Sequence, residues 1–164
     1  MRRVAAASIV ALCCACARTN NQHAVAPDTA FAALQARGAE AMGVDQYTST
    51  HVFETLGDGG RIVLQRDAAD SAGVATIRAH MRDIADRFAK GDFSIPGVVH
   101  AQQVPGTMVM SARRQFIRYA ADTLARGGQV RIFTTDSAAL AAVHEFLAFQ
   151  RMEHHAAGHV HSHE

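Results

Sequence analysis

The chain has 164 residues, of which 49% are hydrophobic and 19% charged, and its formal net charge is +1 at pH 7. This length is typical of one globular domain with a single core. The near balance of acidic and basic side chains excludes the strongly basic face that nucleic-acid-binding domains present. We therefore expect no nucleic-acid partner.

Residues 1–17 are predicted to form a signal peptide, with a basic start and a short apolar run. A helix that spans a bilayer needs about 20 apolar residues, so this run is too short to do so. Two processing patterns fit. Residues 15–17 fit cleavage after Ala17, whereas residues 12–16 resemble a lipobox that ends in a lipidated Cys16. The second pattern is favoured and predicts a bacterial lipoprotein, exported to the periplasm and held at a membrane of the cell envelope by lipid alone.

All three cysteines, Cys13, Cys14 and Cys16, lie in this segment. The rest of the chain therefore has no disulfide, no thiol nucleophile and no thiolate metal ligand. Residues 18–27 are polar and end in a proline, which is typical of a tether. A single domain is expected over residues 28–153 and a histidine-rich tail over residues 154–164.

The domain is expected to begin with a helix capped by Asp28. Residues 49–56 and 61–66 read as a hairpin around Asp58-Gly59, because such a turn needs positive φ values. A second helix is expected from about Asp70 to Lys90, where apolar residues recur at three- and four-residue steps. The glycine that follows Lys90 is well placed to end this helix in a left-handed cap.

A connector from Gly91 to about Arg114 shows little helical periodicity and contains Pro96 and Pro105. Within it, residues 98–100 are expected to be extended. Long connections are uncommon in compact domains and are often functional, so the connector is a candidate site. The alternative is a loop that only covers an edge of the sheet.

Two strands, over residues 115–123 and 129–134, and a helix capped by Asp136 complete the predicted elements. The order α-β-β-α-β-β-α contains two ββα units, which predicts an α+β fold. We expect a two-layer sandwich of a four-stranded antiparallel sheet with the long helices on one face, plus the N-terminal helix. When the units are aligned on their Asp-Ser helix starts, His144 falls opposite Arg78 and His80 opposite Phe146.

Ten histidines are the most unusual feature of the composition. No phosphate-binding glycine loop, His-Glu-x-x-His or Gly-x-Ser-x-Gly motif is present, so no catalytic residue is assigned. One histidine group is the tail, where a flexible tract can offer several imidazoles to copper or zinc. The alternative is a polar tail that binds metal only incidentally. This group consists of His154, His155, His159, His161 and His163.

The second histidine group lies in the body of the domain and consists of His51, His80, His100 and His144. Each alone reads as a structural residue at the boundary of the core. Together, three or four neutral imidazoles could hold copper or zinc if the fold brings them to one place. Met108 and Met110 on the connector could add soft ligands for Cu(I), although methionine more often fills gaps in a core.

The first functional hypothesis is therefore an exported protein that binds a transition metal through histidines. The second is an envelope structural or interaction protein without a small ligand, with the connector as its partner surface. The third is an enzyme that uses His100 as a general base beside Asp92 or Tyr119.

Several short motifs resemble a group of small exported bacterial proteins of uncharacterised function. The resemblance runs from His51 to His154 and rests on residues 77–81, 91–93, 99–100, 105–106, 117–119 and 144–150. Some members of that group carry the label aspartate carbamoyltransferase. The residues here give that label no support, because the Ser-Thr-Arg-Thr loop for carbamoyl phosphate is absent. The catalytic chain of that cytosolic enzyme is also nearly twice as long and has two α/β domains.

Overall fold

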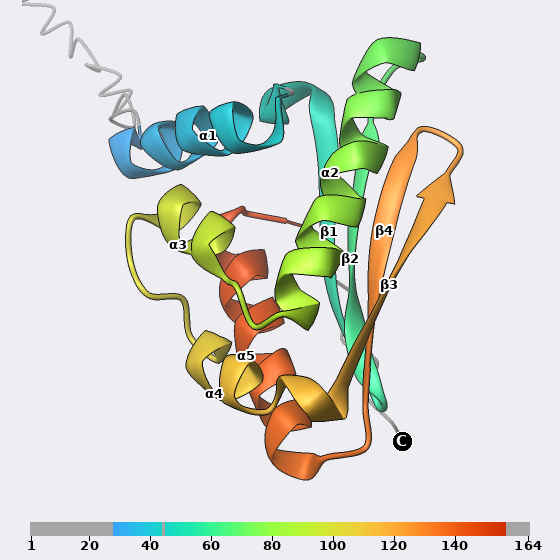
Figure 1. Cartoon of the computed structure of the whole chain (residues 1–164). Helices are drawn as coiled ribbons and strands as arrows, with labels where there is room; N and C mark the ends of the chain where they lie inside the picture. Colours follow the sequence, from blue (N-terminus) through green and yellow to red (C-terminus); the bar gives the residue numbers. More distant parts are fainter. Residues whose placement is uncertain (1–27, 44, 157–164) are drawn as a thin grey trace, which may run out of the picture.

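The computed structural model describes residues 28–43 and 45–156 (Figure 1). The predicted signal peptide, its Cys16, the tether, and His159, His161 and His163 lie outside the described residues. None of the helices in the described part of the chain is both long enough and apolar enough to cross a lipid bilayer.

Four strands form one antiparallel sheet in the order β1-β2-β4-β3, which confirms the predicted α+β class. The two units meet at the centre of the sheet, where Ile62 pairs with Val130 in equivalent positions of β2 and β4. This pairing is the register that a pseudo-twofold axis between the units requires. The strands are β1 (Ser49–Leu56), β2 (Gly59–Arg66), β3 (Ile117–Leu124) and β4 (Gly127–Thr134).

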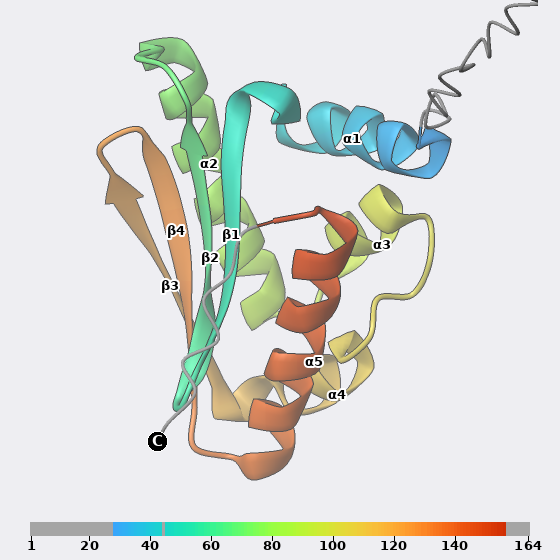
Figure 2. The same ribbon diagram turned by 180° about the vertical axis from the view of Figure 1, so that it is seen from behind.

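The helices α2 (Ser71–Ala89) and α5 (Ser137–Glu153) pack on one face of the sheet (Figures 1 and 2). Each lies mainly over the hairpin of the other unit: α2 contacts β3 and β4, and α5 contacts β1 and β2. Both begin at the predicted aspartate caps. Asp70 accepts a hydrogen bond from the Gly73 amide at 3.1 Å, and Asp136 accepts one from the Ala139 amide at 2.8 Å.

The core lies between this face of the sheet and the two long helices. Burying each large apolar side chain contributes roughly 1.5–3 kcal/mol, so this layer supplies most of the stability. The largest fully buried side chains are Leu64, Ile77, Phe88, Met110, Val130, Ile132, Val143, Phe146 and Leu147.

The C-terminal end of α2 carries the predicted left-handed cap, at Gly91 with a φ of 80°. Its amide donates to the Phe88 carbonyl at 2.9 Å, and the Asp92 amide donates to the Arg87 carbonyl at 2.9 Å. These two bonds define a Schellman motif, which satisfies carbonyls that the helix leaves unpaired.

The prediction that residues 98–100 of the connector are extended is wrong. The segment folds into α3 (Ser94–His100) and α4 (Thr107–Ala112). Helices of seven and six residues are too short to show an amphipathic period in the sequence. Pro96 lies in the first turn of α3, where a helix tolerates a residue without an amide hydrogen.

The helix α1 (Thr29–Met42) packs on α3 beside the C-terminal end of α5 (Figure 2). Asp28 caps it by accepting a hydrogen bond from the Phe31 amide at 3.0 Å. Arg37 joins the two helices, because its Nε donates to the Val99 carbonyl at 2.7 Å. The last turn of α3 is therefore held against α1.

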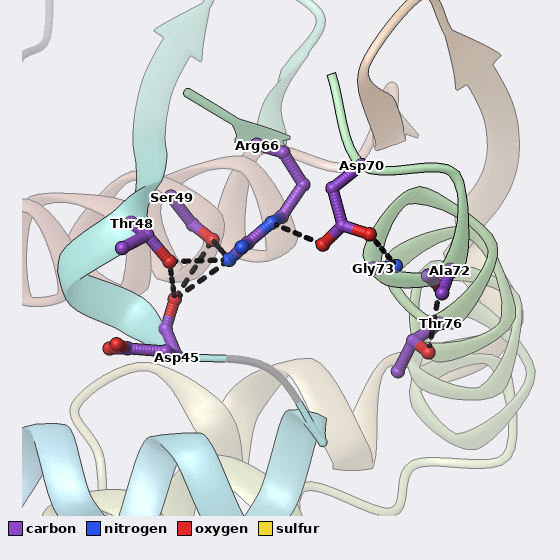
Figure 3. A network of polar contacts seen from close by, with 8 residues as sticks. All are labelled: Asp45, Thr48, Ser49, Arg66, Asp70, Ala72, Gly73 and Thr76. Carbon is purple, nitrogen blue, oxygen red and sulfur yellow. Dashed lines mark hydrogen bonds and ion pairs between the residues drawn. The ribbon is translucent and has the colours of Figure 1, made fainter. Parts of the chain in front are cut away.

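A polar network around Arg66 ties the start of β1 to the start of α2 (Figure 3). Its guanidinium donates to Thr48 Oγ1 at 2.5 Å and to Ser49 Oγ at 3.2 Å, and its Nε lies 3.2 Å from Asp70 Oδ2. The network thus holds Ser49, the first residue of β1, in place two residues before His51. The two short 3-10 turns, Gln46–Thr48 and Arg114–Phe116, each lead into a strand.

Candidate histidine site

A pocket of about 70 Å³ lies beneath α1, among α2, α3, α5 and the sheet. Four histidines from four different segments line it: His51, His80, His100 and His154. We call it the histidine pocket. Its other lining residues are apolar apart from one amide and include no acidic side chain. They are Gly38, Met42, Phe53, Ile62, Leu64, Met81, Ile84, Phe88, Ile95, Pro96, Val99, Phe146 and Gln150.

Three of the histidine rings are in contact, with His154 in the middle. Its ring centroid lies 5.3 Å from that of His51, and the two planes are 17° apart, so these rings stack. The centroid of His100 lies 5.1 Å from that of His154, with the planes at 89°. The Phe53 ring, at 5.4 Å, packs against His154 and makes this end of the cluster apolar.

The fold explains why these rings meet. His51 pairs with buried Leu64 across β1 and β2, so its side chain points to the helical face of the sheet. His100 is the last residue of α3. His154 caps α5, with its amide donating to the Gln150 carbonyl at 3.0 Å. Because α5 crosses the β1–β2 hairpin, its C-terminal end reaches His51.

Three buried ring nitrogens at this pocket have no hydrogen-bond partner within the described residues: His51 Nε2, His100 Nδ1 and His154 Nδ1. His100 Nε2 donates to Gln150 Oε1 at 3.0 Å, so Nδ1 of the neutral ring keeps a free lone pair. The carboxylate of Glu153 lies 4.0 Å from that Nδ1. Buried polar atoms are usually satisfied, so three orphaned nitrogens in one place call for an explanation.

Burial keeps these imidazoles neutral. It lowers the pKa of His51 to about 4, with the nearby His80 as the second cause. It lowers the pKa of His154 to about 3, helped by the charges that His51 and His100 would carry. The pKa values of His80 and His100 are also lowered, in both cases chiefly by burial. A neutral imidazole is the form that binds a metal ion.

The rings as they stand do not form a finished coordination sphere. Across residues 28–43 and 45–156, no three His, Cys, Asp or Glu side chains are arranged to hold a metal ion. The near-parallel stack of His51 on His154 explains this, because two stacked rings do not direct their nitrogens at one common point. Coordination therefore requires these rings to turn about their side-chain torsions.

Of the four body histidines, His51, His80 and His100 line the histidine pocket, whereas His144 does not. Its Nε2 lies 2.9 Å from the Leu56 carbonyl oxygen and 3.1 Å from that of Gly59, at the turn between β1 and β2. The His144 side chain therefore points from α5 to this turn and does not line the histidine pocket.

The remaining predicted ligands that the structure describes lie elsewhere. His155 is exposed and stacks on Phe31, with centroids 4.2 Å apart. Met108 is 67% exposed, whereas Met110 is fully buried in the core, and neither lines the histidine pocket. The two methionines that do line the pocket are Met42 and Met81, which are not among the metal ligands predicted from the sequence.

His154 joins the body histidines although the sequence assigns it to the tail. A signal for this was present, because His154 lies four residues after Gln150 and eight after Phe146, on the stripe that buries α5. Extending that stripe by one turn would have predicted its burial.

The two partners that the general-base hypothesis expects for His100, Asp92 and Tyr119, make their contacts elsewhere. Asp92 pairs with Arg87 at 3.0 Å and accepts a hydrogen bond from the Ser94 amide at 2.9 Å. Tyr119 packs edge-on against Phe88, with centroids 5.8 Å apart. The polar neighbours of the His100 ring are instead Gln150, which it hydrogen-bonds, and Glu153, 4.0 Å from Nδ1.

Comparisons of the chain with protein-family models, with curated proteins and with solved structures give no match. The resemblance to small exported bacterial proteins therefore stays a prediction.

Proposed function

We propose that this chain is an exported protein that binds one transition-metal ion, copper or zinc, in the histidine pocket through His51, His100 and His154. The observation that carries the proposal is the set of three buried ring nitrogens without partners around one pocket. An unsatisfied buried polar atom costs roughly 1–3 kcal/mol. An ion that these nitrogens coordinate would remove that cost.

The size of the pocket favours an ion over an organic ligand. Sites for drug-sized molecules have volumes of roughly 300–1,000 Å³, and a cavity that binds benzene has about 150 Å³. About 70 Å³ is less than half of the smaller value. This volume suits an ion with a water molecule or a ligand of very few atoms.

The protonation state also supports metal binding. Exposed histidines, with a pKa near 6.5, must lose a proton before they bind an ion in mildly acidic solution. Burial removes this competition at His51 and His154, whose pKa values are about 4 and about 3. Gln150 Oε1 accepts a hydrogen bond from His100 Nε2, which keeps the proton on Nε2 and leaves the free lone pair of that ring at Nδ1.

Calorimetric titration of the full chain with Zn²⁺ and with copper tests the proposal. The three cysteines are replaced by serine, and His23, His159, His161 and His163 by alanine, so that the remaining histidines all lie in the described domain. We expect His154→Ala to weaken binding at least tenfold. His155→Ala is the matched control, because this neighbour lies outside the pocket, and it should bind as before. Binding no tighter than millimolar in the parent chain would refute the proposal.

A second candidate function is docking of a protein partner on the segment from Gly91 to Arg114. Val98, Met108 and Val109 of this segment are 62%, 67% and 42% exposed, and Phe116 just beyond it is 50% exposed. Replacing Met108 and Val109 by serine would then abolish co-purification of a partner without changing metal affinity. Unchanged co-purification would remove this candidate.

A further inference from the structure

Building on the proposed metal site, we infer that its ion is Cu(I) and that the thioethers of Met42 and Met81 select it. Met42 is the last residue of α1, and Met81 follows His80 on α2. Both side chains line the histidine pocket. Two thioethers and several imidazoles from separate elements thus surround one small space.

The chemistry of this donor set discriminates among metals. Thioether sulfur is a soft ligand that selects Cu(I), whereas imidazole accepts zinc and copper alike. Met81 is only 3% exposed, so its sulfur is shielded from water. Coordination by a thioether adds little to the affinity for Zn²⁺ or Cu²⁺. The sulfur atoms therefore add affinity for Cu(I) alone.

The charge of the pocket also favours Cu(I), because it suits a monovalent ion better than a divalent one. No acidic side chain is among its lining residues, and the Glu153 carboxylate lies beyond His100, 4.0 Å from Nδ1. The desolvation energy of an ion grows with the square of its charge, so a divalent ion costs about four times as much to bury as a monovalent one. One nearby carboxylate can offset a single positive charge. A monovalent ion is the better match.

The test compares affinities for Cu(I) and Zn²⁺, each measured by competition with a chromophoric chelator, in the full chain with the cysteine and histidine replacements described above. The double variant Met42→Leu and Met81→Leu removes both sulfur atoms and nearly conserves volume. Met110→Leu is the matched control, because Met110 is fully buried outside the pocket.

We expect the double variant to bind Cu(I) at least tenfold more weakly and Zn²⁺ within twofold of the parent. The control should change neither affinity. X-ray absorption of the Cu(I) complex should show sulfur bound to copper. If the double variant loses affinity equally for both ions, or loses no affinity for Cu(I), the inference of Cu(I) selection is overturned while the metal site itself stands. If the parent binds neither ion, the proposed function is refuted as well.

Discussion

Arg78 and His144 occupy equivalent positions in the two ββα units and make the same kind of contact. Arg78 donates to the carbonyls of Leu124 and Gly127, at 2.6 and 3.1 Å, in the turn between β3 and β4. His144 donates from Nε2 toward the carbonyls of Leu56 and Gly59 in the turn between β1 and β2. Each long helix is thus fastened to the hairpin of the other unit. This is a structural role for His144.

Replacing His144 by leucine should destabilise the fold without affecting metal affinity. The substitution leaves two turn carbonyls without their donor, at a cost of roughly 1–3 kcal/mol. His144→Gln keeps an amide donor and should recover part of the loss. Chemical denaturation measures both variants. Equal stability of the leucine variant and the parent would show that this contact contributes nothing.

The metal-free protein should lose stability as the pH falls below 6.5. The folded pKa values of His51 and His154 lie near 4 and 3, below the unfolded value of 6.5. Above pH 6.5 both states are neutral at these rings and their contribution is zero. Between pH 6.5 and about 4 the unfolded chain binds protons that the folded protein does not. The free energy of unfolding therefore falls, at each ring by up to about 1.4 kcal/mol per pH unit.

Thermal unfolding between pH 8 and pH 4 measures this effect. His51→Asn should flatten the decline, because asparagine does not titrate. His155→Ala serves as the control and should keep the slope of the parent. If stability falls with pH as steeply in the His51→Asn variant as in the parent, His51 does not contribute to the decline.

Gly106→Ala should destabilise the protein by about 2 kcal/mol or more. Gly106 has a φ of 79°, which costs other residues roughly 1–2 kcal/mol, and an added Cβ would lie 2.2 Å from the Ala142 carbonyl oxygen. Relief of this clash would push α4 away from α5. Gly57→Ala is the control, because a Cβ there meets nothing within 4 Å. Chemical denaturation compares the two variants, and similar stabilities would contradict the prediction.

The mature protein should begin at a lipidated Cys16 if the predicted lipobox is used. Mass measurement of the protein recovered from a bacterial membrane fraction distinguishes this outcome from a chain that starts at Arg18. Cys16→Ser should release the protein from the membrane in the first case only.

The strands and long helices were predictable because their signals are local and repeated. The Asp-Ser helix starts and the glycine turns specify each ββα unit, and the stripe on α2 specifies its buried face. The histidine pocket was only partly predictable, since its rings come from four segments and meet only after the helices cross. No periodicity marks α3, so the position of His100 at the end of a helix could not be predicted.

The crossing of α2 and α5 over each other's hairpins also determines when the histidine pocket can form. His51 belongs to the first strand, whereas His154 follows the last helix. A ribosome releases the first strand long before α5 exists, and the first unit alone would leave its hairpin uncovered. The pocket therefore arises only when the whole domain has folded. Any ion that it holds must enter after synthesis of the domain is complete.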